Sequence, residues 1–157
     1  MSEPRWLTPR EAEIWAMYRR LGRGLQRAQD QQLQRDSGIS AADYALLAPL
    51  SESEDGVLRA RELGAWVDWE RSRLSHQISR MEKRGLVVRE ACADDARGSM
   101  VRLTAKGRET VEGAAPGHVD IVRQLFFGPL DADETKTLGD LLGRIVAAVE
   151  GDTEGGA

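Results

Sequence analysis

The sequence predicts a mainly α-helical protein that carries one small β-hairpin. Apolar residues recur at helical spacing through most of the 157 residues. Two short β-type runs, residues 86–89 and 100–103, flank a polar connection of the kind that closes a hairpin. No run approaches the roughly 18 apolar residues that cross a bilayer, and the N-terminus lacks the apolar stretch of a signal peptide. We therefore expect a soluble, cytoplasmic protein.

The first predicted helix is long. Thr8 and Glu11 form a capping pattern at its start, with Pro9 between them. The helix is expected to run to about Arg35, where Gly38 follows, and such a helix is a rod of about 40 Å. Because a small domain cannot cover so long an apolar stripe, we expect a partner chain to cover it. The stripe consists of Ile14, Tyr18, Leu21, Leu25 and Ala28.

Three shorter helices are expected in the middle of the chain. Ser40 is the N-cap of the second helix, and Pro49 is expected to end or kink it. A polar loop follows over residues 51–56. The third helix is expected over residues 60–67, and the fourth over residues 71–84, immediately before Gly85.

Two more helices follow the hairpin. The fifth begins at Ala105, is expected to be interrupted or bent over residues 113–117, and resumes over residues 118–127. The sixth opens after a capping pattern at Asp131. Residues 151–157 are expected to be disordered. The sixth helix has the most regular apolar stripe of the chain: Leu138, Leu141, Leu142, Ile145, Val146 and Val149.

Charge is unevenly distributed along the chain. Residues 70–108 contain ten basic and five acidic residues, a local net charge of +5, although the whole chain carries -4. A basic segment inside an acidic chain is typical of a local phosphate-binding surface. This segment is therefore the first place to look for a nucleic-acid contact.

The fourth helix presents a polar, basic face. Leu74, Ile78 and Met81 are spaced to pack inward. No acid occurs between Arg71 and Met81, and small hydroxyls beside arginine suit a helix that enters the major groove. The third and fourth helices then form a helix-turn-helix and the hairpin its wing. The predicted DNA-binding residues of this helix are Ser72, Arg73, Ser75, His76, Ser79 and Arg80.

The hairpin loop supplies a second candidate contact. Arg97 lies beside Gly98, where a guanidinium can extend into a narrow minor groove. Asp95 lies two residues earlier and is expected to support the shape of the wing. The predicted architecture is thus a winged helix-turn-helix domain over residues 39–109, with a helical dimerisation region formed by residues 1–38 and 110–150.

Three motifs in register resemble the MarR family of bacterial winged-helix regulators. They are MEKRGLV (residues 81–87), the D-x-R of Asp95 and Arg97, and LTAKG (residues 103–107). The resemblance implies a two-fold dimer formed by the first, fifth and sixth helices. It also implies repression or activation at a pseudo-palindromic operator, modulated by a ligand or oxidant, and we expect a repressor. Glu70 departs from the family pattern, in which a neutral Ser or Thr is commoner.

Effector binding and two rival functions remain open at this stage. Family effectors bind between the dimer helices and the winged domain, which makes Trp15, Tyr18, Tyr44 and His118 candidate pocket residues. Trp6 and Phe126 are further aromatic candidates, and packing in the core or at the dimer interface is the favoured explanation for each of the six. The rivals are a thiol switch through Cys92 and a protein-interaction module without DNA binding. No spacing indicates a metal site, a cofactor or a catalytic set.

Overall fold

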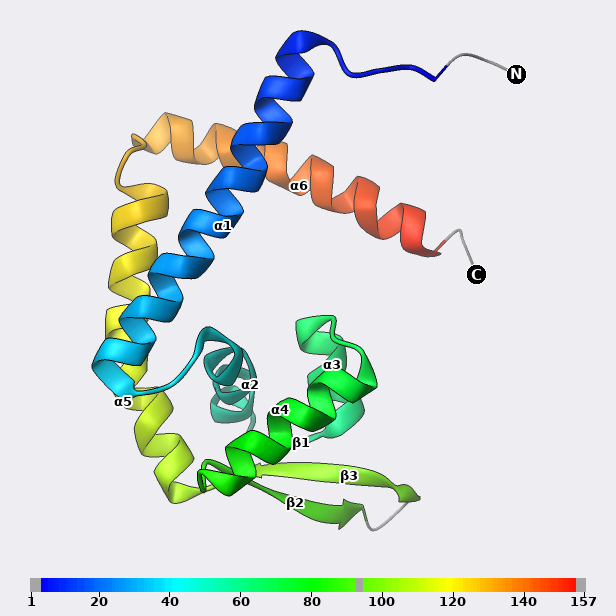
Figure 1. Cartoon of the computed structure of the whole chain (residues 1–157), viewed down its shortest axis with the longest axis vertical. Helices are drawn as coiled ribbons and strands as arrows, with labels where there is room; N and C mark the ends of the chain where they lie inside the picture. Colours follow the sequence, from blue (N-terminus) through cyan, green and yellow to red (C-terminus); the bar gives the residue numbers. More distant parts are fainter. Residues whose placement is uncertain (1–3, 93–94, 155–157) are drawn as a thin grey trace. The chain divides into compact units, whose positions relative to one another are not determined.

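The computed structural model describes residues 4–92 and 95–154. Two compact units make up the chain, Met1–Val119 and Asp120–Ala157, and each is described by itself below. The order of elements along the chain is four helices with a short strand among them, a hairpin, and further helices (Figure 1). The predicted mainly helical fold with a small antiparallel sheet is confirmed.

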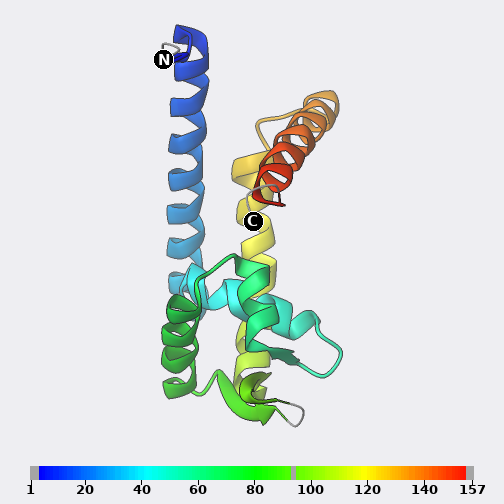
Figure 2. The ribbon, with the colours of Figure 1, turned by 90° about the vertical axis from the view of Figure 1, so that its right-hand side faces the viewer.

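Helix α1 spans Pro9–Ser37 and is a straight rod (Figure 2). The predicted capping box is present, since the Glu11 amide donates to Thr8 Oγ1 at 3.3 Å and the Thr8 amide donates to Glu11 Oε2 at 2.7 Å. Gly38 ends the helix in the left-handed region, with φ 63°. That conformation strains residues with a Cβ atom, which explains why glycine stands here.

Both prolines expected to break helices lie within continuous ones. Helix α2 spans Ala41–Glu52 and continues past Pro49, whose carbonyl accepts a hydrogen bond from Ser53. Helix α5 spans Ala105–Val122 and continues through Pro116. The predicted helix end at Pro49 and the predicted interruption over residues 113–117 are therefore wrong, whereas the alternatives, a kink at Pro49 and a bend over residues 113–117, stay predictions. A proline removes only one helical donor, and packing of α5 against α1 maintains the rest: a Cβ on Gly117 would lie 2.6 Å from Gln32 Nε2.

The sheet has three strands rather than the two that the sequence predicted. Strand β1 spans Val57–Arg59, β2 spans Val87–Cys92 and β3 spans Asp95–Leu103. The order is β1-β3-β2, and both pairings are antiparallel. Because β1 has only three residues, it is too short to show a strand periodicity. Its pairing with β3 anchors the start of the next helix to the hairpin.

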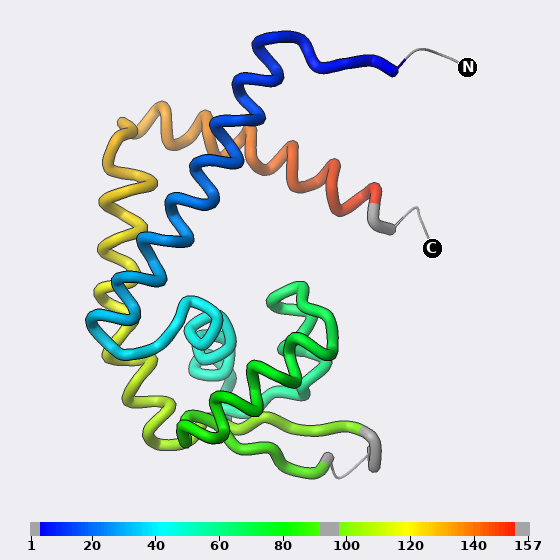
Figure 3. Tube along the Cα trace, viewed as in Figure 1, coloured from blue at the N-terminus to red at the C-terminus, as the bar shows by residue number. Residues whose placement is uncertain are grey.

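Helix α3 spans Ala60–Val67 and helix α4 spans Arg71–Lys83, close to the predicted bounds. The turn between them is tight (Figure 3), and Asp68 takes a positive φ of 51° there. One core holds these elements to α2, the sheet and the buried ends of α1 and α5. Its fully buried side chains include Leu33, Ile39, Leu46, Leu47, Leu50, Leu63, Ile78, Met81 and Val101.

The second unit contains a π-helix, Arg123–Phe127, and helix α6, Ala132–Glu154. Asp131 and Glu134 form the predicted capping box, with bonds of 2.8 and 2.9 Å. Helix α6 runs through Glu154, so residues 151–154 are helical and not disordered as predicted. Across residues 4–92 and 95–154, none of the helices combines the length and the apolar character that a bilayer crossing demands.

Candidate nucleic-acid interface

Helix α4 lies on the core by one face. Leu74, Ile78 and Met81 are buried as predicted, and Gln77 is buried with them. Gly64 of α3 allows close packing here, since a Cβ at this position would lie 3.2 Å from Leu74 Cδ2. The two helices are therefore fixed against each other, and the opposite face of α4 is left at the surface.

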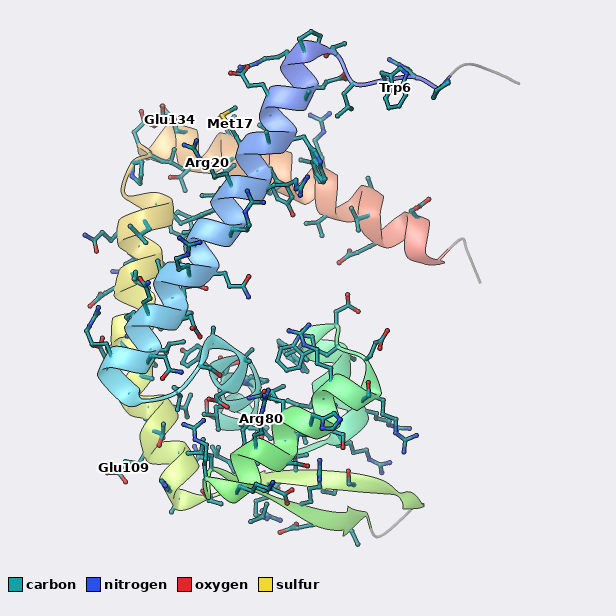
Figure 4. The ribbon with its side chains drawn as sticks, viewed as in Figure 1. Trp6, Met17, Arg20, Arg80, Glu109 and Glu134 are labelled. Atoms are coloured by element: carbon teal, nitrogen blue, oxygen red, sulfur yellow. The ribbon has the colours of Figure 1, made fainter. Side chains whose placement is uncertain are left out.

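One edge of the outward face carries arginines. The guanidinium of Arg73 lies 4.1 Å from the centre of the Trp69 ring, a cation–π contact that restricts its orientation. Arg80 (labelled in Figure 4) donates a hydrogen bond to Gln77 Oε1. Ser72 and His76 are exposed between the two edges. Arg73, His76 and Arg80 thus stand at the surface, and Arg73 and Arg80 each contact a side chain that is buried or half-buried.

The other edge of α4 is covered by an arginine that the sequence interpretation missed. Arg89 of β2 donates to Ser75 O at 2.7 Å, to Ser75 Oγ at 3.2 Å and to Ser79 Oγ at 3.1 Å. It also forms an ion pair with Glu82 at 3.2 Å. Ser75 and Ser79 are therefore hydrogen-bonded within the protein, and the guanidinium lies beside them. The sequence pattern of the strand could have indicated this contact. Side chains alternate along a strand, so Arg89 shares a sheet face with buried Val87.

The base of the hairpin is fixed by charge. Arg102 of β3 donates to both oxygens of Glu90 on β2, at 2.6 and 3.0 Å. Hydrogen bonding to Arg102 lowers the pKa of the Glu90 carboxyl. The LTAKG segment closes the wing, since Thr104 Oγ1 donates to Gly85 O at 2.7 Å and Lys106 Nζ donates to Arg84 O at 2.8 Å.

The predicted wing residues fall outside what the structure describes. The backbone of β3 includes residues 95–97, but the side chains of Asp95 and Arg97 lie outside the described part, as does that of Cys92. The roles expected for these three residues stay predictions.

The aromatic candidates for an effector pocket form separate pairs. Tyr44 of α2 and His118 of α5 have ring centres 4.3 Å apart. Trp15 and Tyr18 stack on each other along α1 at 5.2 Å. Fourteen residues of helix separate Tyr18 from Gln32, which packs against α5, a distance of about 21 Å. Within one chain, Trp15 and Tyr18 are therefore not brought to Tyr44 and His118. Trp6 is exposed, and Phe126 contacts Phe127 edge-on.

Burial acts on the Tyr44–His118 pair. It lowers the pKa of His118 below its ordinary value of 6.5 and raises the pKa of Tyr44. Two buried polar atoms, His118 Nδ1 and Gln32 Oε1, have no hydrogen-bond partner in the described part of the chain. In the same described part, no group of His, Cys, Asp and Glu side chains is arranged to hold a metal ion.

Two helices joined by a tight turn, followed by an antiparallel hairpin, define a winged helix-turn-helix protein. The MarR family model matches residues 37–98. Transcriptional regulator HosA of Escherichia coli is 31% identical over 108 residues, which cover 69% of this chain and 78% of HosA. The chain therefore belongs to the MarR family of transcriptional regulators.

Two solved structures from Streptomyces coelicolor extend this likeness over nearly the whole chain. Sco3205, a MarR family regulator determined in complex with DNA, is 45% identical, with a TM-score of 0.85 and coverage of 92% of this chain and 90% of that one. AbsC, another MarR family regulator, is 38% identical, with a TM-score of 0.87 and coverage of 94% and 99%.

Proposed function

We propose that this chain is a homodimeric repressor that binds a pseudo-palindromic DNA operator and responds to a small-molecule effector. The observation that carries the proposal is the outward face of α4, which lacks acidic residues from Arg71 to Met81 and stands on a fully packed core. Such a helix can enter the major groove while its inner face stays in place.

Each side chain on this face has a proposed role. Ser72 and His76 occupy the centre and approach base edges. Arg73 and Arg80 supply charged donors from one edge to bases or phosphates. Ser75 and Ser79, proposed from the sequence as direct contacts, act in this proposal together with Arg89, whose guanidinium they hold at the other edge. Arg97, supported by Asp95, is the proposed minor-groove contact of the wing.

The relatives support DNA as the partner. Sco3205 shares 45% of its residues with this chain and was crystallised with DNA. A transcriptional regulator of Mycobacterium tuberculosis, MOSR, is 30% identical with a TM-score of 0.68 and was also determined in complex with DNA.

Exposed apolar stripes support the dimer. On α1 the stripe comprises Ile14, Trp15, Met17, Tyr18 and Leu21, and on α6 it comprises Leu141, Leu142, Ile145 and Val146. Monomeric proteins rarely leave contiguous apolar surface of this kind in water. Because two-fold dimers place one recognition helix at each half-site, a dimer also accounts for a pseudo-palindromic operator.

The surroundings of His118 support an effector. Its Nδ1 and Gln32 Oε1 are buried without hydrogen-bond partners among the described residues, a cost that a bound molecule with a polar group would relieve. The adjoining Tyr44 ring offers an aromatic ligand a stacking surface. Titration with small aromatic molecules that carry a hydrogen-bond donor would test this when followed by fluorescence anisotropy of an operator duplex, with operator release as the expected response. An operator affinity that no such molecule alters would contradict the effector part of the proposal.

The test of DNA binding is fluorescence anisotropy on a duplex that the protein itself enriches from a random library. We expect affinity to fall steeply with salt, and Arg73→Ala to weaken binding by about tenfold. The matched control is Arg20→Ala, which removes an exposed arginine of α1 (Figure 4). We expect it to leave the affinity for the duplex unchanged. Failure to enrich any duplex, or binding insensitive to salt, would favour an interaction module that does not bind DNA.

A further inference from the structure

A buried carboxylate lies directly beneath the recognition helix. Asp43 of α2 is only 1% exposed. Its Oδ1 accepts a hydrogen bond from Gln77 Nε2 at 2.7 Å, and its Oδ2 accepts from Arg84 Nη1 at 2.7 Å and from the Ser40 amide at 2.8 Å. Burial raises the pKa of Asp43, but the bonds from Ser40 and Arg84 outweigh it and hold the pKa below 3.8. The group is therefore ionised at neutral pH.

The bonds of Asp43 continue in two directions. Arg84, at the C-terminal end of α4, uses its second nitrogen to donate to Gly38 O at 2.7 Å, at the C-cap of α1. Gln77, held by Asp43, accepts from the Arg80 guanidinium on the DNA-facing side. We call Gly38, Asp43, Gln77, Arg80 and Arg84 the Asp43 network. It connects the end of the long helix α1 to an arginine on the proposed reading face.

These contacts restrain α4 in a way that the apolar core does not. Apolar packing is less directional than hydrogen bonding, so Leu74, Ile78 and Met81 define the orientation of α4 less sharply than charged hydrogen bonds do. Charged hydrogen bonds are directional, and the planar fork of Arg84 reaches Asp43 and Gly38 together in one arrangement. A shift of α4 would leave a buried charge without its partners, which is strongly unfavourable.

We propose that Asp43 is a positioning residue for DNA recognition: it fixes the orientation of α4 and, through Gln77, aims Arg80 at the DNA. This inference rests on the proposed function, because it assigns the supports of the same reading face. We therefore expect Asp43 to affect how well the protein discriminates between DNA sequences. The general attraction of the basic face for phosphates does not depend on the network, since that attraction requires charge and not a particular orientation.

The experiment compares wild type with Asp43→Asn on the duplex enriched by wild type and on a scrambled duplex of the same composition. Asparagine keeps an oxygen for Gln77 but loses the charge that holds Arg84. We expect affinity for the enriched duplex to fall by at least about tenfold, with affinity for the scrambled duplex and the salt slope unchanged. Glu13→Gln is the matched control: it breaks an exposed pair with Arg10 that has the same 2.7 Å separation and leaves both affinities as in wild type.

A double-mutant cycle separates positioning from general damage. Arg84→Lys keeps the positive charge but cannot reach Asp43 and Gly38 together, so it is expected to lower discrimination in the same way. The double variant should lose no more than the weaker-binding single variant. A folded Asp43→Asn protein with wild-type discrimination, or additive losses in the cycle, would overturn the proposal.

The outcome is readable even if Asp43→Asn does not fold. Circular dichroism identifies that case, and Arg84→Met, at a partly exposed position, then replaces it. Wild-type discrimination in folded Arg84→Met overturns the role of the network, whereas lost discrimination supports it. If wild type itself does not distinguish the two duplexes, the proposed function fails and not only this inference.

Discussion

The winged-helix part of the chain and helix α6 place similar aliphatic residues in opposite surroundings. Leu47 of α2 is fully buried, whereas Ile145 of α6 is 60% exposed in the single chain. Both helices begin at a capping box and both carry aliphatic residues at helical spacing. The difference shows that helical pattern alone does not say what covers an apolar face. In the first case other elements of the chain cover it, and in the second we propose a second copy.

The largest expected effect comes from a charge on the exposed stripe. Ile145→Asp should convert the dimer to monomers, because the side chain enters a two-fold interface twice. Loss of about 1.5–3 kcal/mol at each position removes roughly 3–6 kcal/mol, or at least about a hundredfold in the dissociation constant. Sedimentation equilibrium measures this. If Ile145→Asp remains a dimer, α6 does not contribute to the interface. The contrast between its exposed stripe and the buried face of α2 would then not be explained by a second copy.

A core substitution should act on folding at every protein concentration. Leu47→Ala is expected to lower the free energy of unfolding by about 2–5 kcal/mol, because it leaves a cavity in a packed core. Urea denaturation at two protein concentrations measures the loss. An equal loss of unfolding free energy at both protein concentrations would distinguish this core position from Ile145, whose effect depends on dimerisation. A loss below about 1 kcal/mol would show that the core is not packed as described.

His118 is intermediate between buried Leu47 and exposed Ile145, because it is half-buried beside Tyr44. Burial lowers the pKa of His118 in the folded chain below 6.5. The unfolded chain therefore binds a proton at this residue more readily than the folded chain does. The contribution of neutral His118 to the free energy of unfolding is therefore fully present above about pH 6.5. It is lost as the pH falls from there toward the pKa of His118 in the folded chain. We expect His118→Phe, which keeps the ring contact, to reduce this dependence. Denaturation midpoints from pH 7.5 to 5 would show it, and identical slopes in both proteins would contradict it.

The smallest effect is expected on the solvated side of α1. Glu13→Gln removes the exposed ion pair with Arg10 and should change the free energy of unfolding by less than about 0.5 kcal/mol. The same denaturation experiment measures it. A larger loss would show that this side of α1 is also covered in the assembled protein.

Local signals in the sequence were enough to predict most helices. Thr8, Ser40 and Asp131 cap their helices through residues three positions away, so the evidence lies within one turn. The positions of apolar residues and Gly85 predicted the third and fourth helices. The resemblance to the MarR family is confirmed. The predicted DNA contacts, effector residues and domain boundaries stay predictions.

The misses depend on contacts between distant residues. Pro49 and Pro116 lie within helices that continue past them. Strand β1 exists because β3 pairs with it. Arg89 reaches Ser75 across 14 positions, and Asp43 reaches Gln77 and Arg84 across 34 and 41. Of these residues, only Arg89 has a periodic signal in the sequence, its alternation with Val87 along the strand, and that signal does not identify the serines it contacts.

Gly38 has a mechanical consequence. The 29 residues of α1 end at this single left-handed residue, and a Cβ there would meet nothing within 4 Å. Glycine therefore sets the angle between α1 and α2 without filling space. Because α1 is a stiff lever of about 43 Å, a tilt of roughly 5° at Gly38 displaces its other end by about 4 Å. By the same geometry, a displacement of a few ångströms at the N-terminal end of α1 corresponds to a rotation of only a few degrees at Gly38, whose carbonyl accepts the Arg84 hydrogen bond.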